Sequence, residues 1–338
     1  MTTSAVIAVF NGSRTIRAAL DSVLRQTLPP DEILVIDDGS TDDTFALLKS
    51  YTPRVTLFRQ ENMGVAATRN ALCARAKGDL IGFLDSDDLW HPRYLETIHQ
   101  LFNDNVNGVA FFTGHVNFAG YGDYIWDSDP PRTATDIEVI SQLEFLRRYN
   151  RTTGYFASMS YCSLPKRVIT ALGKEPFRTN GVEDSYLCTT LPLYGPVVYT
   201  PSPLAAYRVT NDSLSVNRLK LFGNWVRVFE LLEERYNMEA GGQLRKEFRI
   251  AYASKKRQYG KLLMAAGNSS EARRQFWRSI GTSSIPPSVA KSIAFLLASY
   301  LPSPLQPKWP PLFRQANEHG QEEHSTDRRH EPVAGPRS

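Results

Sequence analysis

Three aspartates stand within four positions in the stretch FLDSDDLWHP, residues 83–92. They follow an apolar run that is typical of a buried strand, where desolvation and mutual repulsion both disfavour charge. In an extended chain, Asp85 and Asp87 point to one side and Ser86 to the other. Two carboxylates on one side suit Mg²⁺ or Mn²⁺, which take their other ligands from water and substrate phosphates. The stretch therefore predicts a cation site that acts on a diphosphate, with a surface turn as the simpler alternative.

A second acidic cluster, IDDGSTDDT, ends another apolar run at residues 36–44. Asp and Ser favour turns and helix N-termini, so Asp37 and Asp38 have a purely structural explanation. The functional interpretation is that a carboxylate at the end of a strand accepts a hydrogen bond from the N–H of a ligand base, because an ionised carboxylate is an acceptor only. We expect the two acidic clusters to lie close together.

The elements that must position these residues alternate along the first hundred positions. Apolar runs predict strands, and the segments between them have the spacing of amphipathic helices. The predicted strands are 5–10, 32–37, 55–60 and 80–85. This order predicts a parallel sheet with right-handed crossovers and helices on both faces. Ligands of such sheets bind beyond the carboxyl ends of the strands, which here carry NGS, DDGS, ENMG and DSDD.

The rest of the chain changes character twice. We expect residues 111–216, rich in Tyr, Gly and Pro, to form a second half of the domain that residues 1–110 begin. Residues 217–302 have helical spacing and predict a helical extension. The polar segment 303–338 predicts a disordered tail.

Charge is divided unevenly along the 338 residues, of which 42% are hydrophobic. Residues 1–216 hold 19 Lys and Arg against 24 Asp and Glu, whereas residues 217–314 hold 17 against 6. The basic part could meet an anionic membrane surface or a partner, and no motif supports binding of nucleic acid. Three distant cysteines predict a reduced, cytoplasmic protein, and the N-terminal residues predict neither a signal peptide nor a membrane anchor.

One helix of the basic part could lie on a membrane. Residues 288–301 are too short to span a bilayer but place apolar side chains on one helical face. Packing of this helix on the protein body is the alternative. The predicted face consists of Val289, Ile293, Leu296, Leu297 and Tyr300.

Five motifs in order resemble those of glycosyltransferase family 2, which has the GT-A fold. They are VFNGSRTIRAALDSVLRQT, VIDDGSTDDT, ENMGVAATRNAL, GDLIGFLDSDDLWHP and NGVEDSYL, and the resemblance covers residues 4–210. It implies an α/β fold with a Rossmann-like, mostly parallel central sheet. It also implies transfer of a sugar, with inversion, from a nucleotide-diphosphate donor to an acceptor hydroxyl. On this resemblance, residues 1–110 would be the nucleotide-sugar-binding half of the domain and residues 111–216 the acceptor-binding half.

The resemblance assigns roles to residues of this chain. Asp87 would be the protein ligand of Mg²⁺ or Mn²⁺, while Asp88 is less certain and could cap the next helix. Asp184 would be the general base that takes the proton of the acceptor hydroxyl, with Glu183 second. The alternative for this pair is helix capping, because acidic residues are favoured in a first helical turn. The donor would contact Val9, Phe10, Asn11, Asp38, Arg69, Asn70, Asp85, Ser86 and Arg208.

One position departs from the pattern of the family. Similar enzymes often have a metal-binding histidine shortly after a YR pair, but here Thr210 stands there and no histidine occurs between His115 and His319. Asp87 would therefore hold the metal without a histidine. Arg208 could compensate, or could form a structural ion pair.

Aromatic residues near these motifs have two interpretations. Trp90 is expected to pack beneath the metal loop. Tyr155, Phe156 and Tyr161 could stack on an acceptor sugar, but packing in the core is the more frequent role of such residues.

These observations predict a metal-dependent inverting glycosyltransferase, with a UDP-sugar as the favoured donor and a glycan or glycolipid as acceptor. Bacterial surface polysaccharide or glycolipid synthesis, at the inner face of the cytoplasmic membrane, is the expected setting. A metal-dependent nucleotidyltransferase and a catalytically silent nucleotide-sugar-binding subunit are the alternatives.

Overall fold

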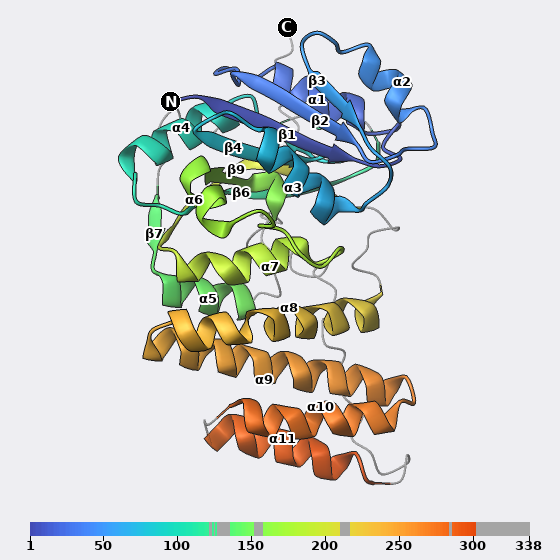
Figure 1. Ribbon diagram of the computed structural model, residues 1–338, viewed down its shortest axis with the longest axis vertical. Coiled ribbons are helices and arrows are strands. Elements are labelled where there is room, and N and C mark those ends of the chain that lie inside the picture. Colours follow the sequence, from blue (N-terminus) through green and yellow to red (C-terminus); the bar gives the residue numbers. More distant parts are fainter. Residues whose placement is uncertain are drawn as a thin grey trace, which may run out of the picture.

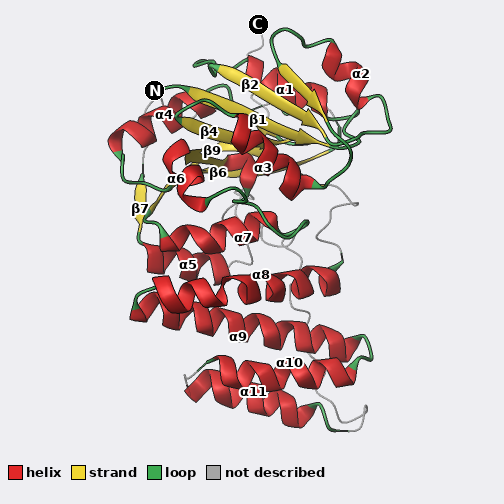
Figure 2. Cartoon of the chain, in the orientation of Figure 1, coloured by secondary structure: helices red, strands yellow, loops and turns green. Residues whose placement is uncertain are grey.

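A computed structural model describes residues 1–121, 124, 126, 136–151, 158–209, 217–283 and 286–301. One sheet with its flanking helices forms one end of the molecule, and the last four helices stack away from it (Figure 1). Figure 2 shows that all strands lie in the sheet end. Thr210, Tyr155, Phe156 and the predicted tail 303–338 lie outside the described residues.

The first half of the sheet is parallel, as the sequence predicted. Its strands follow the order β3 (Thr56–Arg59), β2 (Glu32–Asp37), β1 (Thr3–Val9) and β4 (Leu80–Asp85). The helices between them are α1 (Ile16–Leu24), α2 (Thr44–Lys49) and α3 (Val65–Arg75). β1, β2 and β4 are almost wholly buried, because helices cover both faces of the sheet, and this explains their continuous apolar runs, whereas β3 at the edge is partly exposed.

The register of these strands gathers the acidic clusters at one edge. Val9 pairs with Asp37 on one side of β1, and Ala8 pairs with Asp85 on the other. Asp37 also pairs with Arg59 of β3. The expectation that the DDGS and DSDD loops lie together is therefore met by the register.

The second half of the sheet mixes directions. It holds β5 (Leu89–Trp90), β6 (Ala110–Ala119), β7 (Glu138–Ile140), β8 (Cys162–Pro165) and β9 (Val197–Val209). β8 is antiparallel to β4 and β6, and β9 is parallel to β6. The helices of this half are α4 (Tyr94–Asp104), α5 (Gln142–Arg151), α6 (Lys166–Leu172), α7 (Glu183–Thr190), η1 (Met159–Tyr161) and η2 (Leu191–Leu193).

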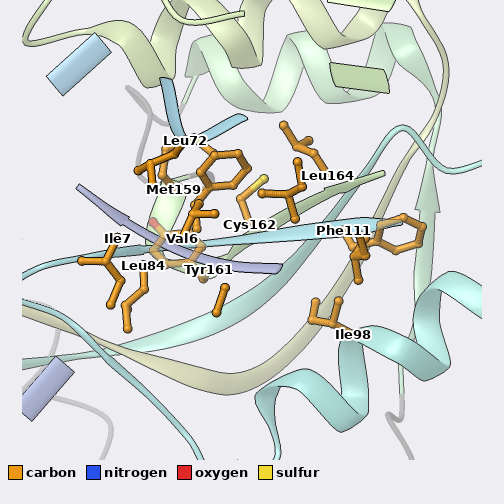
Figure 3. Close-up of a cluster of buried hydrophobic side chains, with 14 of the residues drawn as sticks. Val6, Ile7, Leu72, Leu84, Ile98, Phe111, Met159, Tyr161, Cys162 and Leu164 are labelled. Atoms are coloured by element: carbon orange, nitrogen blue, oxygen red, sulfur yellow. The ribbon is translucent and has the colours of Figure 1, made fainter. Parts of the chain in front are cut away.

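One hydrophobic core joins the two halves. Figure 3 shows Leu84 of the first half and Cys162 of the second among its side chains. Trp90, 1% exposed, lies in this core and stacks on Tyr94 with ring centroids 4.3 Å apart, so its predicted role in packing is confirmed. The three cysteines are buried and free.

The C-terminal helices form the predicted extension. They are α8 (Arg218–Glu239), α9 (Gly242–Ala265), α10 (Ser269–Thr282) and α11 (Pro286–Ala298). Two further hydrophobic clusters hold them, one between α8, α9 and the end of the acceptor half, the other between α9, α10 and α11. The predicted α/β fold with a mostly parallel sheet and a helical extension is thus confirmed.

The face predicted for residues 288–301 is divided between two environments. Leu296 packs against the α9–α10 cluster, whereas Leu297 is 65% exposed and Tyr300 is 64% exposed. In the part of the chain that the structure describes, no helix is both long and apolar enough to cross a membrane.

Candidate active site

The three aspartates after β4 occupy different environments. Asp85 ends the strand with 29% of its side chain exposed, and Asp87 stands in the turn that follows. Asp88 is 1% exposed, and its Oδ1 accepts a hydrogen bond from the Arg208 backbone N–H at 2.7 Å. The next helix, α4, has Arg93 at its N-cap, so the interpretation of Asp88 as a helix cap is wrong. Asp88 instead ties the turn to β9.

Charge is concentrated in this turn. Burial raises the pKa of the Asp87 carboxyl to about 6, and repulsion from Asp85 adds to the rise. Burial also raises the pKa of Asp88 well above its usual range, with repulsion from Asp87 second. A divalent cation would relieve this repulsion, so the pair Asp85 and Asp87 fits Mg²⁺ or Mn²⁺.

The protein supplies only part of such a coordination shell. Among the residues with described positions, no cluster of three or more His, Cys, Asp or Glu side chains is placed to hold a metal. The remaining ligands would come from a diphosphate and water, as is usual for Mg²⁺.

Arg208 lies against the same turn. Its Nε donates to the Asp87 carbonyl oxygen at 2.6 Å, its Nη1 donates to the Gly120 carbonyl, and its guanidinium lies 4.3 Å from the centroid of the Phe118 ring. Arg208 is 3% exposed, so it fixes the backbone of the turn and lowers the charge repulsion around Asp87. Its predicted contact with the donor stays a prediction.

A buried arginine connects the DSDD turn to the Glu-Asp pair. The Arg69 guanidinium of α3 pairs with Asp85 through Nη2 and with Glu183 through Nη1, the latter at 2.6 Å. Its side chain is 7% exposed, and the pairs with Asp85 and Glu183 outweigh burial and raise its pKa. Asp85 and Glu183, which are far apart in the sequence, thus meet at one cation.

Glu183 and Asp184 differ in how they are engaged. One carboxylate oxygen of Glu183 pairs with Arg69, and the other accepts a hydrogen bond from the Gly181 N–H at 2.8 Å. Oδ1 of Asp184 accepts from Ser185, and its Oδ2 accepts no hydrogen bond from the residues that the structure describes. Burial raises the pKa of Asp184 to about 7, with repulsion from Glu183 second, while Arg69 opposes the rise. Asp184 is therefore the freer proton acceptor of the two.

The loop before α7 is bound to α3 at two further points. The Asn70 side chain exchanges two hydrogen bonds of 2.9 Å with the backbone of Phe177. Asn180 Oδ1 accepts from the Ala66 N–H at 3.0 Å, and its side chain lies over Gly64. Asn70 thus positions this loop in the structure, and its predicted contact with the donor remains untested.

The residues predicted to line the base and ribose lie at the ends of β1 and β2. Val9 is buried and Phe10 is 48% exposed. Asn11, with φ of +50°, donates its N–H to Ser40 Oγ at 2.9 Å. The turn after β1 is thereby joined to the DDGS turn.

Asp38 is already engaged within the protein. Its carboxylate accepts from Gln60 Nε2 at 2.7 Å, the Met63 N–H at 3.0 Å and the Gly64 N–H at 2.8 Å. It is 3% exposed. Asp38 therefore holds the loop after β3, and a hydrogen bond to a base would have to use a remaining lone pair.

Sequence reasoning missed Ser160 and Asn180. Ser160 Oγ accepts the Asp85 N–H at 3.2 Å, and the Ser160 carbonyl accepts Trp90 Nε1 at 2.7 Å. No local motif marks either residue, although NG in NGVEDSYL signals a turn beside the Glu-Asp pair. Tyr161 is 3% exposed and stacks on His115 at 4.5 Å, which agrees with the core interpretation.

Comparison with known proteins identifies relatives. The sequence profile described as "Glycosyl transferase family 2" matches residues 4–169. The chain is 28% identical over 250 residues to "Putative glycosyltransferase EpsH" of Bacillus subtilis, covering 70% of each. Among solved structures, S. aureus TarS 1–349 in complex with UDP-GlcNAc has a TM-score of 0.65 at 14% identity, with 89% of each chain covered. This chain covers 54% of a longer TarS chain.

A third similar protein is the mannosyltransferase PcManGT of Pyrobaculum calidifontis in complex with GDP-Man and Mn²⁺. It has a TM-score of 0.55 and 18% identity, covering 90% of this chain and 81% of that one. Both structures show the likeness of fold. The family match includes both acidic loops and ends before α7.

Proposed function

Because this chain belongs to glycosyltransferase family 2, we propose that it moves a sugar from a nucleotide-diphosphate donor to an acceptor hydroxyl with inversion. The observation that carries this proposal is the Arg69 guanidinium, which holds Asp85 of the DSDD turn and Glu183 beside Asp184. A donor-binding turn and a proton acceptor are thereby fixed to one cation.

Each side chain has a separate task. Asp87, with Asp85 beside it, would hold Mg²⁺ or Mn²⁺, which would neutralise the diphosphate of the donor. The Arg69 bridge fixes the distance between that turn and α7. Phe10, half exposed at the end of β1, offers an apolar surface for the base.

The reaction is a single displacement. The acceptor oxygen attacks the anomeric carbon from the side opposite the diphosphate, the new C–O bond forms and the bond to the diphosphate breaks. Asp184 takes the proton of the acceptor hydroxyl. The pKa of about 7 supports this role, because a base is most effective when its pKa lies near the working pH.

The test is a screen of UDP- and GDP-sugars, with UDP-GlcNAc and GDP-mannose first, with and without Mn²⁺. TarS and PcManGT motivate these two donors. Release of nucleoside diphosphate and transfer to glycan or glycolipid acceptors are the readouts. Asp87→Asn should abolish metal-dependent donor binding, whereas Asp184→Asn should retain binding and lose transfer by about 100-fold or more.

The screen identifies a catalytically silent subunit, which would bind a donor and turn over none. A parallel assay with nucleoside triphosphates and sugar phosphates tests for a nucleotidyltransferase, which would release pyrophosphate. If no nucleotide sugar binds or reacts, the proposed function is wrong.

We also propose that the helical extension contacts an anionic membrane surface, which would bring the enzyme to a glycolipid acceptor in bacterial surface polysaccharide synthesis. Leu297 and Tyr300 expose apolar surface at the end of the extension, and Trp277 of α10 is 67% exposed. Residues 217–314 carry 17 Lys and Arg against 6 Asp and Glu, so their charge complements anionic lipid. This contact would place the enzyme at the inner face of the cytoplasmic membrane.

A further inference from the structure

The helical extension contacts α7 at Ser185, the residue that follows Asp184. Trp225 of α8 is 8% exposed, and its indole Nε1 donates to Ser185 Oγ at 3.0 Å. Ser185 follows Asp184 in the chain and is 5% exposed. In Figure 1, α8 lies next to α7 on the side away from the sheet. A side chain of the extension therefore reaches the neighbour of the proposed base.

The hydrogen bonds run in one direction toward the carboxylate. The indole N–H can only donate, so Ser185 Oγ accepts from Trp225 and keeps its own proton to donate. Ser185 Oγ lies 3.3 Å from Asp184 Oδ1, and the Ser185 backbone N–H donates to the same oxygen at 2.6 Å. Both donors hold Oδ1, which leaves Oδ2 of Asp184 for the substrate proton.

A buried cation lies over the ring of the Trp225 indole. Lys255 Nζ of α9 lies 3.9 Å from the centroid of the Trp225 ring, and Lys255 is 6% exposed. A cation over an indole face draws electron density toward itself, and this makes the N–H a stronger donor. Tyr149 and Ser185 line a cavity of about 10 Å³ with these two side chains, which is about the size of one water.

We propose that Trp225 and Ser185 are positioning residues for Asp184, so that the helical extension forms part of the catalytic machinery. This inference rests on the proposed function, in which Asp184 is the general base. The two residues fix the rotamer of Asp184 and stabilise its charged form against burial. A merely structural role would require only that Trp225 fill space between α7 and α8.

The titration of Asp184 depends on several groups that face it. Arg69 favours the carboxylate, while the other facing groups favour its protonated form or are neutral near pH 7. The titratable groups that face Asp184 all lie outside the helical extension. These groups are Arg69 of α3, Asp85 of β4, Glu183 and Cys188 of α7, Tyr149 of α5 and Tyr161 of η1.

Two substitutions remove the donors one at a time. Trp225→Phe keeps an aromatic ring beneath Lys255 and removes the N–H, and Ser185→Ala removes the hydroxyl. A matched control is Tyr236→Phe, because the Tyr236 hydroxyl of α8 donates to the Thr189 carbonyl of α7 at 2.6 Å and so joins the same two helices away from Asp184.

The experiment measures kcat and KM against pH in the full-length protein, with the donor that the screen identifies. Trp225→Phe and Ser185→Ala should each lower kcat by about tenfold with an unchanged KM for the donor. The acid limb of the kcat profile should move to higher pH by about half a unit, because the Asp184 carboxylate loses a hydrogen bond that stabilises its charged form. The double variant should lose no more kcat than the single variant with the larger loss, since both substitutions break the same chain of hydrogen bonds.

The outcomes are distinguishable. If Trp225→Phe and Ser185→Ala both behave as Tyr236→Phe does in kcat and acid limb, the inference is overturned, while an inactive Asp184→Asn still supports the proposed function. If Asp184→Asn transfers sugar normally, the proposed function itself fails. Thermal unfolding identifies a variant that does not fold, and the remaining variant then decides, because either one must move the acid limb.

Discussion

At the scale of single residues, the proposed metal ligand Asp87 should make metal binding depend on pH. Its pKa of about 6 exceeds the ordinary value of 3.8, so the carboxyl holds a proton over a range in which an exposed aspartate is ionised. A metal ion bound by Asp87 would compete with that proton. Affinity for Mn²⁺ should therefore rise with pH and level off above about pH 6.

This dependence can be measured as Mn²⁺ binding by calorimetry in the presence of nucleoside diphosphate between pH 5 and 8. Below the pKa of Asp87, the affinity should fall by up to about tenfold for each pH unit. Asp42, a carboxylate in the DDGS loop whose pKa is about 2, provides the control: Asp42→Asn should leave the profile unchanged. An affinity that is constant from pH 5 to 8 would show that Asp87 is not the ligand.

Type and spacing drew attention to the carboxylates at two strand ends and predicted a cation site, and the resemblance to the family supplied the role of each residue. Sequence reasoning could not assign the partners of Asp38, which are two backbone amides and Gln60 from the neighbouring loop. Nor could it find the role of Asp88, because the hydrogen bond from the Arg208 N–H joins positions 120 residues apart.

At the scale of elements, the contact between α3 and the loop before α7 depends on Gly64. Gly64 has φ of +85° and ψ of 160°, and a Cβ there would meet the side-chain amide of Asn180. Gly173 shares this backbone region, with φ of +89° and ψ of −160°, yet a Cβ there would meet nothing within 4 Å. Comparing an alanine substitution at Gly64 with one at Gly173 therefore separates the cost of the steric contact from the cost of backbone strain.

Gly64→Ala should therefore destabilise the protein more than Gly173→Ala, whose cost is backbone strain of about 1–3 kcal/mol. The measurement is urea unfolding of both variants. The double variant Gly64→Ala with Asn180→Ala should lose less stability than Gly64→Ala alone and approach Gly173→Ala. The reason is that the added Cβ at position 64 no longer meets the Asn180 side chain. Equal losses in the two single variants would contradict the close approach of this loop to α3.

The elements themselves were more predictable than their contacts. The strands 32–37 and 80–85 were predicted with the bounds of β2 and β4, since burial on both faces gives a continuous apolar run. The strands of the second half were not placed, because β8 and β9 join the sheet through antiparallel and long-range pairings. Such pairings leave no signal in local periodicity.

At the scale of the whole molecule, the chain is polarised between an acidic sheet end and a basic helical end. Residues 1–216 have 5 more acidic than basic residues, and residues 217–314 have 11 more basic than acidic residues. The sheet end carries the proposed chemistry. The far end exposes a few apolar side chains, namely Trp277 of α10 and Ile293 and Leu297 of α11.

This polarity predicts binding to vesicles that contain anionic phospholipid, and weak binding to neutral ones. Leu297→Asp should weaken flotation with anionic vesicles, because it places a negative charge on the apolar surface of α11. Deletion of residues 285–338 should weaken flotation further, and added salt should reduce binding of the unaltered chain. Met238→Asp is the matched control, because Met238 is 68% exposed on α8, away from α11. If the Leu297→Asp and Met238→Asp variants float equally well, α11 does not contact the lipid. If light scattering shows that Leu297→Asp turns an oligomer into a monomer, a second copy of the chain covers this surface in place of the membrane.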